Sequence, residues 1–213
     1  MIIPPGALAK DDIRFNFDLG GGAAMDGGYV ASAACYFAGA TKDSEFEVKE
    51  AKARLLASDP RIDEVMVATM EIRTPGRKPT TAKTDADLRP PPILGFIPRL
   101  YGPSVEIELE KVKIIFDDFI APSVFHVVVI VNKETGRRKT EKRYIGGTEW
   151  GETGEKWYST YRWQLEAFVN RIRGKEEGGW VSLDESEVVM KYIDGLYEKT
   201  ELAARCYRRI ATR

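Results

Sequence analysis

The sequence is poor in the residues that metal sites and disulfide frameworks need. It has two cysteines, Cys35 and Cys206, one histidine, His126, and no CxxC pair. Two cysteines are too few for a disulfide framework, and one histidine excludes a metal site built from several histidines. We therefore expect a reduced protein without a bound metal, in which Cys35 is a small buried residue of an apolar helix.

Long apolar runs and an excess of charge of one sign are also absent. No run reaches the roughly 18 apolar residues that span a bilayer, and the N-terminal residues lack the basic and apolar regions of a secretory signal. The net charge of −1 gives no global attraction to nucleic acid or anionic membranes. The sequence therefore predicts a cytoplasmic protein with no membrane span and no nucleic-acid partner.

The most informative segment is the glycine-rich run of residues 17–40, FDLGGGAAMDGGYVASAACYFAGA. A phosphate-binding glycine loop follows a buried apolar strand, whereas this run follows a short alternating piece, IRFNFD, so we expect no nucleotide-binding half-domain before it. The pattern predicts a turn and then a helix that begins at Tyr29 and stops at Gly39. Tyr29, Ala33 and Phe37 would form the apolar face of this helix.

The middle of the chain alternates between apolar and polar residues, which is typical of antiparallel strands. Strands are expected over residues 45–58, 63–72, 82–88 and 104–119, followed by a hairpin over 123–145 with its turn at 132–136. Asp85 and Asp87 fall on one side of their strand. Paired carboxylates can transfer protons, but we expect these two to face solvent.

Two helices are expected near the C-terminus. The first, over residues 155–174, has an apolar stripe and stops at Gly174. The stripe consists of Trp157, Tyr161, Leu165, Phe168, Val169 and Ile172. The second helix, over residues 182–199, starts with Ser182 and Glu185 at capping-box spacing. Its expected buried face consists of Val189, Ile193, Leu196 and Tyr197.

Segregated strands and helices indicate an α+β fold, an open and mostly antiparallel sheet with helices packed on one face. The chain shows no internal repeat and no second hydrophobic core. We therefore expect a single α+β domain over residues 1–213, in which residues 1–16 are an extended lead-in.

Five segments resemble, in the same order and over nearly the whole chain, the C-terminal domain of the Gfo/Idh/MocA oxidoreductases. They lie at residues 5–26, 29–40, 85–91, 157–174 and 181–199. The resemblance is greatest to the fungal dihydrodiol/D-xylose dehydrogenase branch, and it implies that residues 17–213 form this type of domain. That family binds NAD(P) in an N-terminal Rossmann domain that carries a catalytic lysine in a Glu-Lys-Pro motif. Neither that motif nor a GxGxxG after a strand occurs here, so we expect a Rossmann-less, free-standing protein without a cofactor.

The chain departs from the family at its chemical centre. The family pattern is Asp-x-Gly-x-(Tyr/His), whereas Asp26-Gly27-Gly28-Tyr29 is one residue shorter. On one continuous helix, a deletion of one residue rotates the two side chains by about 100° relative to each other. Asp26 and Tyr29 are therefore not expected to keep the mutual geometry of the family.

Three residues are the candidate catalytic groups. Tyr29 is the expected proton donor, and Asp26 would orient it, act as a base, or simply cap the helix that starts there. His126 would be an acid or base if it points into a cavity, and otherwise a residue of the sheet face.

The candidate substrate-binding residues are mostly aromatic. The resemblance places Tyr161 and Arg162 on a helix that faces the pocket, where Arg162 would bind a substrate carboxylate or form a structural ion pair. The other candidates lie in glycine- and proline-containing loops that would close the pocket or pack on the sheet. They are Phe96, Tyr101, Trp150, Trp157 and Tyr158.

Three functions remain open. The first is a cofactor-independent enzyme that folds an apolar secondary metabolite for cyclisation, as a pericyclase such as an intramolecular Diels-Alderase, or for isomerisation or elimination. The second is the substrate-binding domain of an NAD(P)-dependent sugar or dihydrodiol dehydrogenase. The third is a non-catalytic module. A homodimer through the open sheet face is expected, as in the family that the chain resembles.

Overall fold

The computed structural model describes residues 12–90, 94, 103–142, 158–175 and 179–202. The chain is α+β and groups into two compact units. The three-stranded unit comprises Ile3–Leu100 with Val181–Arg213, and the four-stranded unit comprises Met1–Ile2 with Tyr101–Trp180. Among the residues described, no helix has the length and apolar character that a membrane crossing requires.

The sheet of the three-stranded unit is antiparallel, with the order β1-β2-β3. Its strands are β1 (Glu45–Leu56), β2 (Asp59–Arg73) and β3 (Thr80–Asp87), which confirms the three strands expected there. Successive side chains of a strand point to opposite faces. The buried residues of β2 that alternate in this way are Met66, Ala68, Met70 and Ile72.

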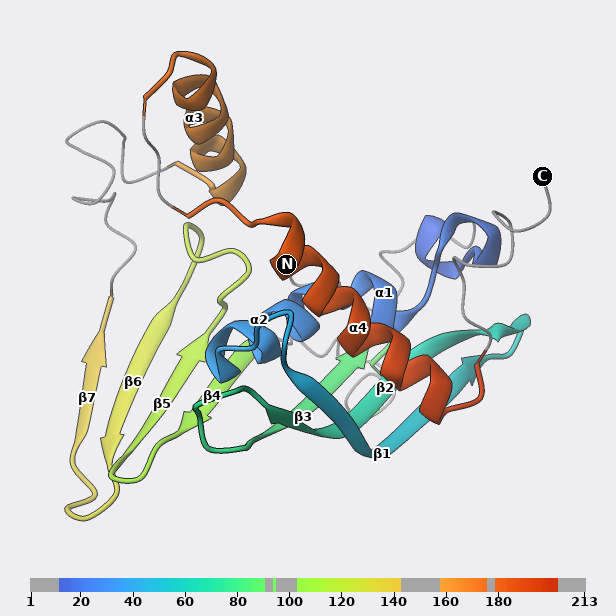
Figure 1. The fold of residues 1–213 in the computed structure, drawn as a ribbon, viewed down its shortest axis with the longest axis horizontal. Coiled ribbons are helices and arrows are strands. Elements are labelled where there is room, and N and C mark those ends of the chain that lie inside the picture. The colour runs from blue at the N-terminus through green and yellow to red at the C-terminus, as the bar shows by residue number, and fades with distance from the viewer. Residues whose placement is uncertain (1–11, 91–93, 95–102, 143–157, 176–178, 203–213) are drawn as a thin grey trace. The chain divides into compact units, whose positions relative to one another are not determined.

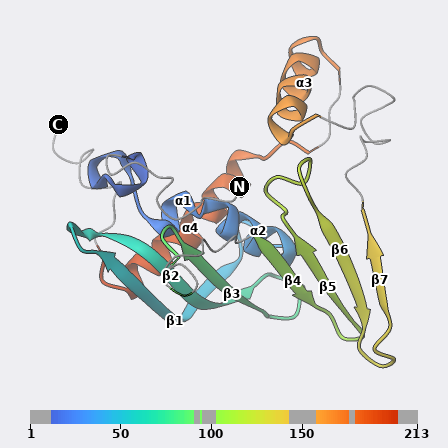
Figure 2. The same ribbon diagram turned by 180° about the vertical axis from the view of Figure 1, so that it is seen from behind.

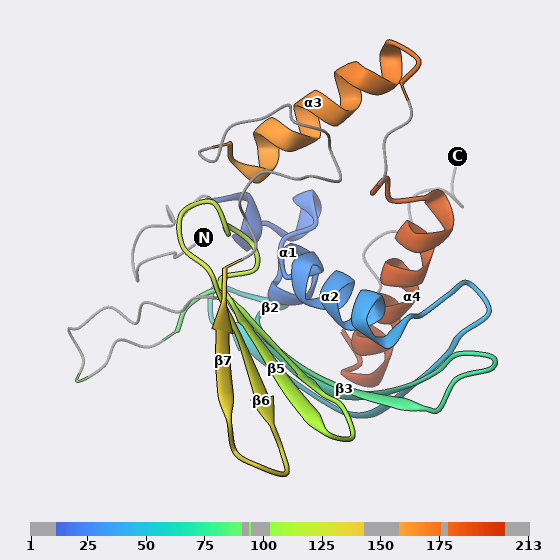
Figure 3. The ribbon, with the colours of Figure 1, turned by 90° about the vertical axis from the view of Figure 1, so that its left-hand side faces the viewer.

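Three helices cover that apolar face: α1 (Ala23–Asp26), α2 (Gly28–Ala38) and α4 (Leu183–Lys199). Figures 1 and 3 show them on the same side of the sheet, where α1 contacts β2, α2 contacts β3 and α4 contacts β1. The core is thus a layer between helices and sheet. It includes both buried tyrosines of α4, Tyr192 and Tyr197.

Helix α2 buries a different face from the one expected. Ala31, Cys35 and Ala38 are buried, whereas Tyr29 and Phe37 are 55% and 43% exposed. Small side chains let α2 lie close to α4 and β3, which the aromatic face would prevent. The helix ends as expected, because Gly39 takes the left-handed conformation typical of a C-terminal cap.

The opposite face of the sheet carries charged side chains. Figure 2 shows this side, with the strands in front of α4. Arg54 forms ion pairs with Glu64 and Asp87. Asp85 is exposed on β3, one of the two edge strands of this sheet. The expectation that Asp85 and Asp87 face solvent is confirmed.

The four-stranded unit contains an antiparallel sheet of order β4-β5-β6-β7. Its strands are β4 (Ser104–Glu108), β5 (Val112–Asp117), β6 (Val127–Asn132) and β7 (Arg138–Glu141). The prediction of a single strand over residues 104–119 is therefore wrong, because this segment forms a hairpin of the two strands β4 and β5. The alternation is interrupted at this turn, where the charged residues Glu110 and Lys111 are adjacent, and the sequence interpretation missed that interruption. The expected turn at 132–136 is confirmed, and its Gly136 N–H donates to the Asn132 carbonyl at 2.9 Å.

The two C-terminal helices begin at serine caps. Helix α3 (Thr160–Ile172) follows Ser159, whose side chain accepts from the Arg162 N–H. The capping box of α4 is present as predicted, with Ser182 and Glu185 bonded reciprocally. The apolar stripe expected on α3 is not buried. Its exposed members are Tyr161, Leu165, Phe168 and Ile172.

Candidate functional site

The described residues before the first glycines form two short 3-10 helices rather than the expected extended lead-in. They are η1 (Ile13–Phe15) and η2 (Phe17–Leu19). Asp12 caps η1, because its carboxylate accepts the Arg14 backbone N–H at 3.0 Å. The cap fixes the start of this segment and places the Arg14 side chain beside the Asp12 carboxylate.

Two cation–π contacts attach the segment to the sheet. The Arg89 guanidinium lies 4.2 Å from the centre of the Phe15 ring, and the Arg61 guanidinium lies 4.5 Å from the centre of the Phe17 ring. Such contacts are worth about 0.5–1 kcal/mol each at exposed positions. Phe15 also packs against the core. These residues are therefore fixed to the three-stranded unit, which also contains α1.

The glycine run brings α1 close to Arg14. A Cβ at Gly21 would lie 2.5 Å from the Arg14 carbonyl oxygen, so only glycine fits there. Gly22 follows with φ 138°, a conformation that side chains disfavour. The glycines thus serve a tight backbone crossing that turns the chain into α1.

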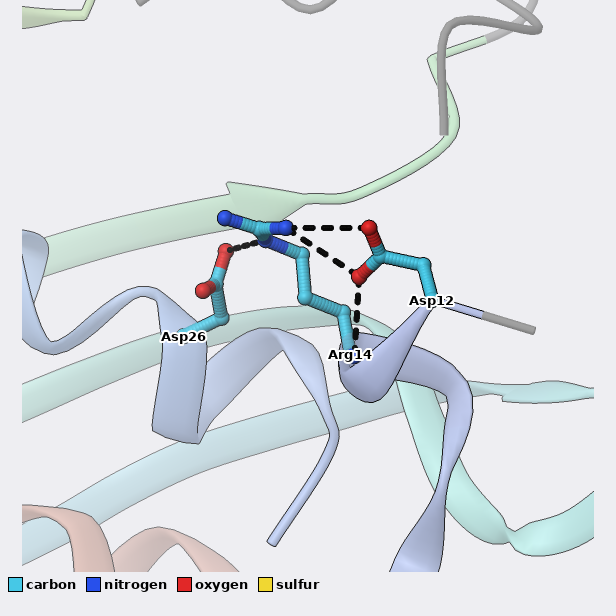
Figure 4. Close-up of polar contacts among 3 residues, drawn as sticks. All are labelled: Asp12, Arg14 and Asp26. Carbon is cyan, nitrogen blue, oxygen red and sulfur yellow. Dashed lines mark hydrogen bonds and ion pairs between the residues drawn. The ribbon is translucent and has the colours of Figure 1, made fainter. Parts of the chain in front are cut away.

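Arg14, Asp12 and Asp26 form a polar cluster at this crossing. Figure 4 shows the Arg14 guanidinium between the two carboxylates. Its Nε donates to Asp26 Oδ2 at 2.9 Å, and its Nη1 donates to Asp12 Oδ1 and Oδ2 at 3.1 and 3.2 Å. The Arg14 and Asp26 side chains are 23% and 34% exposed, so the cluster is partly accessible to solvent.

The three charges stabilise one another. Partial burial acts to lower the pKa of the Arg14 guanidinium, but the bonds to Asp26 and Asp12 outweigh it and raise that pKa. The hydrogen bond from the Arg14 backbone N–H is the main reason that the pKa of Asp12 lies below its ordinary value. Arg14 is therefore a permanently charged donor that both carboxylates share.

The cluster retains one donor and one acceptor for a ligand. Within the described ranges, Arg14 Nη2 and Asp26 Oδ1 make no hydrogen bond. Figure 4 shows Nη2 without a contact on the side of the guanidinium away from Asp12. With all three groups ionised, the formal charge of the cluster is −1, from one guanidinium and two carboxylates. It is suited to a neutral group that both accepts and donates a hydrogen bond.

Asp26 and Tyr29 lie on different helices. Asp26 ends α1, Gly27 is the junction residue with φ −72° and ψ 19°, and α2 begins at Gly28. A Cβ at Gly27 would lie 2.4 Å from the Ala23 carbonyl oxygen, which explains the glycine. Within the described residues, no hydrogen bond joins Tyr29 to Asp26.

The expected helix-capping role of Asp26 is wrong. The N-cap of α2 is Gly27, which has no side chain to accept a bond, and Asp26 binds Arg14 instead. Tyr29 lies in the first turn of α2 with 55% of its surface exposed, so its side chain is largely open to solvent.

A buried carboxylate on β2 is hydrogen-bonded to the first turn of α1. Asp63 is fully buried on β2, where it accepts the Ala24 N–H of α1 at 2.7 Å and the Tyr197 hydroxyl of α4 at 3.1 Å. Sequence reasoning missed this residue, because an aspartate at the start of an alternating strand has the same pattern as a solvent-facing one.

Arg14 and Asp12 were also missed. Both lie in the DDIRF segment, which the alternation presented as an extended lead-in. An aspartate two residues before an arginine was the available signal, since aspartate favours helix N-caps. The long-range partner, Asp26, has no comparable signal in the sequence.

The remaining described candidates belong to the four-stranded unit. His126 is buried just before β6, and its Nδ1 lies 2.8 Å from the Pro122 carbonyl oxygen. The ring is thus held by the backbone of its own loop. Tyr161 is 72% exposed on α3. Phe96, Tyr101, Trp150 and Trp157 lie outside the described residues.

Arg162 forms a local ion pair, one of the two roles expected for it. Its Nη2 lies 2.5 Å from Glu166 Oε1, one helical turn along α3, and its guanidinium is 5.0 Å from the centre of the Tyr158 ring. The contact with Tyr158 is the main reason that the pKa of Arg162 is raised, and Glu166 adds to the effect. Over the part of the chain that is described, no cluster of three His, Cys, Asp or Glu residues could hold a metal ion.

Two solved structures share the fold. One is an oxidoreductase from Sinorhizobium meliloti, with a TM-score of 0.58 and 12% identity over 84% of this chain and 50% of that chain. The other is a 3-ketoreductase from Actinomadura kijaniata, in complex with NADP and TDP-benzene, with a TM-score of 0.60 and 18% identity over 93% of this chain and 51% of that chain. No protein-family model matches the sequence, and no curated protein matches it significantly.

At these identities the likeness shows the fold alone. It confirms the predicted α+β class, here with two antiparallel sheets. The chain spans about half the length of each of the two proteins that it matches. The activity of the whole proteins therefore comes to this chain only as a proposal.

Proposed function

We propose that this chain is the small-molecule-binding half of an oxidoreductase-type fold, and that its ligand binds where Arg14, Asp26 and Tyr29 meet the solvent. The observation that carries the proposal is the Arg14–Asp26 pair, which keeps Nη2 and Oδ1 available three residues before an exposed tyrosine. The likeness to two oxidoreductases, one of them solved with NADP, supports it at the level of the fold.

The chemistry of the cluster defines the polar part of the ligand. A carboxylate or phosphate would be repelled by Asp12 and Asp26, whose two negative charges exceed the single positive charge of Arg14. An amide, an enol next to a carbonyl, or a hydroxyketone offers the acceptor that Nη2 needs and the donor that Oδ1 needs. The exposed rings of Tyr29, Tyr36 and Phe37 on α2 suit an apolar remainder of the ligand.

In this proposal the chemistry of the chain itself is proton transfer. The Tyr29 hydroxyl donates a proton or a hydrogen bond to the ligand carbonyl, while the Arg14–Asp26 pair holds the adjacent polar group. In an NAD(P)-dependent sugar or dihydrodiol dehydrogenase, the nucleotide that receives or supplies the hydride would be bound by another domain.

A second candidate is a cofactor-independent cyclase, such as an intramolecular Diels-Alderase, or an isomerase for an apolar secondary metabolite. One observation favours it. Asp26 binds Arg14 and lies on a different helix from Tyr29, with Gly27 between the two helices. Holding a flexible substrate in a reactive conformation can supply several kcal/mol without any cofactor.

The polar specificity is tested with two small probes of similar size. 2-Pyrrolidinone is a neutral cyclic amide with adjacent C=O and N–H groups, and acetate is an anion that can only accept hydrogen bonds. In NMR titrations, pyrrolidinone should shift the Arg14 Nε–H signal and the Gly27 amide, and acetate should not. Arg14→Gln and Asp26→Asn should abolish the pyrrolidinone shifts. Arg73→Gln, whose guanidinium pairs with Glu47 outside the cluster, should leave them unchanged. Equal shifts with acetate, or no shift with pyrrolidinone, would contradict the proposal.

A different measurement separates the two candidate functions. Linear polyenes that carry an amide or an enol are incubated with the protein alone, with NADPH, and with NADPH plus a supplied Rossmann domain. Turnover without nucleotide supports the cyclase or isomerase, and turnover only with NADPH and the Rossmann domain supports the dehydrogenase half. Tight binding of NADPH to the chain alone would overturn the cofactor-independent candidate.

Self-association remains a separate proposal. The outer face of β1–β3 carries ion pairs such as Arg54–Glu64, so a homodimer through that face would depend on salt. Sedimentation at low and high salt measures this. A monomer at both salt concentrations would contradict a dimer held at that face.

A further inference from the structure

We propose that Asp63 is a positioning residue, which holds the Arg14–Asp26 pair in place by capping α1 from the neighbouring strand. Its functional meaning rests on the ligand surface proposed above. The structural test requires no ligand, so a failure of either proposal can be distinguished from a failure of the other.

The first step is the missing cap of α1. Gly22 occupies the N-cap position and offers no side chain, so the first N–H groups of the helix lack a local acceptor. Asp63 Oδ2 accepts the Ala24 N–H at 2.7 Å. Asp63 thus serves α1 as an N-cap carboxylate supplied by β2 rather than by the preceding residue.

The second step is the anchor on α4. The Tyr197 hydroxyl donates to Asp63 Oδ1 at 3.1 Å, and both side chains are buried, at 0% and 2% exposure. A buried carboxylate that loses a donor is costly, because its charge cannot turn to water. One carboxylate therefore connects α1, β2 and α4 at a defined geometry.

The third step leads from Ala24 to Asp26. Helix α1 has only four residues, and a helix of one turn has little stability of its own. Its bonds include Asp26 N–H to the Gly22 carbonyl at 2.9 Å and Gly27 N–H to the Ala23 carbonyl at 2.7 Å. If Asp63 releases the Ala24 N–H, this turn loosens, and Asp26 leaves its 2.9 Å contact with Arg14 Nε.

The chain offers a matched control on α4. Tyr192 is buried like Tyr197, but its hydroxyl bonds to Thr84 on β3 at 3.0 Å instead of to Asp63. Tyr197→Phe and Tyr192→Phe each remove one buried hydroxyl from the same helix. Only the Tyr197 hydroxyl is connected to α1, through its hydrogen bond to Asp63.

The test follows the Ala24 amide and the Arg14 Nε–H by NMR in folded protein. Tyr197→Phe should shift both signals, while Tyr192→Phe should leave them in place at a comparable loss of stability to urea. Asp63→Ala should shift them further. Asp63→Asn should restore them in part, because its side-chain oxygen can still accept the Ala24 N–H.

Binding of 2-pyrrolidinone provides the functional readout. Tyr197→Phe and Asp63→Ala should weaken it by roughly tenfold, and Tyr192→Phe should not change it. If Asp63→Ala does not fold, the two tyrosine variants decide the matter. The role of Asp63 would be overturned if the chemical shift of the Arg14 Nε–H did not change in Tyr197→Phe. It would also be overturned if that shift changed equally in Tyr192→Phe. A wild-type protein that does not bind the probe would refute the ligand surface and leave the structural result intact.

Discussion

Arg14 Nε and Asp26 Oδ2 lie 2.9 Å apart, and this contact joins the 3-10 lead-in to the end of α1. It also gives the glycine-rich run its role. The glycines let the chain cross beneath Arg14, so that the last residue of a one-turn helix meets the guanidinium. The cluster therefore depends on backbone geometry as much as on charge.

The contribution of this cluster to stability is measurable. Arg14→Gln removes the shared cation and leaves two partly buried carboxylates beside each other. We expect a loss of about 1–2 kcal/mol in the free energy of unfolding, from the hydrogen bonds to charged groups. Urea denaturation measures it. Arg73→Gln is the control and should cost less, because Arg73 pairs with Glu47 at exposed positions.

The junction between α1 and α2 should tolerate no side chain at Gly27. A methyl group there would lie 2.4 Å from the Ala23 carbonyl oxygen and 2.9 Å from the Ala86 Cβ. We expect Gly27→Ala to destabilise the fold by about 1–3 kcal/mol, the usual range for overpacking.

Gly28→Ala is the matched control for Gly27→Ala. Nothing lies within 4 Å of the added Cβ at Gly28, and alanine is a better helix former than glycine. Its thermal midpoint should therefore equal or exceed that of the wild type. If Gly27→Ala and Gly28→Ala had equal thermal midpoints, the backbone between α1 and α2 would have to accommodate the added methyl group at residue 27.

These examples show which parts of the molecule local patterns can predict. The strands β1–β3, the stop at Gly39 and the capping box at Ser182 follow from alternation and cap chemistry over a few residues. The hairpin between β4 and β5 was missed, although the adjacent charged residues Glu110 and Lys111 interrupt the alternation at its turn. The apolar positions change there from odd to even numbers, which was the available signal for the reversal.

The site was less predictable because its contacts are long-range. Tyr29 and Asp26 were proposed as site residues from their motif, but the partner of Asp26 is Arg14, and nothing in the sequence links the two. On α2 the burial of Cys35 is confirmed, whereas the apolar face was assigned to Tyr29 and Phe37 because Ala31 and Ala38 are small. Close helix packing selects small residues, whereas a hydrophobicity pattern favours large aromatic ones.

Tyr29→Phe tests the proposed proton donor. In whichever reaction the chain performs, removal of the hydroxyl should lower the rate by roughly 10² or more. Urea denaturation checks that the variant remains folded. Tyr36→Phe, on the same helix and 76% exposed, should keep the full rate. If the two variants have the same rate, Tyr29 is not the donor.

The capping box of α4 should make stability depend on acid. Bonds from the Ser182 N–H and hydroxyl lower the pKa of Glu185 in the folded state. A lowered folded-state pKa adds stability above the unfolded pKa, which is about 4.3, and this stability is lost as the pH falls through the folded value.

Ser182→Ala removes the hydroxyl from this capping box, while the Ser182 backbone N–H can still donate to Glu185. It should cost about 1 kcal/mol at pH 7, the typical value of an N-cap. The difference between variant and wild type should shrink below about pH 4, once Glu185 is protonated. Urea unfolding at both pH values measures this. A difference that stays constant with pH would assign the whole effect to the serine hydroxyl.

The Cys35 thiol should be inert in the folded protein. Burial against the core raises its pKa to about 12, so almost no thiolate forms at neutral pH. With Cys206→Ser as background, Cys35 is the only thiol. Labelling by a disulfide reagent at pH 8 should then proceed only as fast as the protein opens, and urea should accelerate it strongly. Rapid labelling without denaturant would place Cys35 outside the core.

The same burial predicts a loss of stability in alkali. The unfolded thiol ionises near pH 8.5, whereas the folded thiol does so only at about pH 12. Between these values the unfolded state loses the proton first, so the free energy of unfolding falls by up to about 1.4 kcal/mol per pH unit. Cys35→Ala in the Cys206→Ser background should remove this component. The alkaline contribution of Tyr192, whose pKa burial also raises to about 12, should remain. An identical alkaline slope in the two proteins would show that Cys35 does not titrate as a buried thiol.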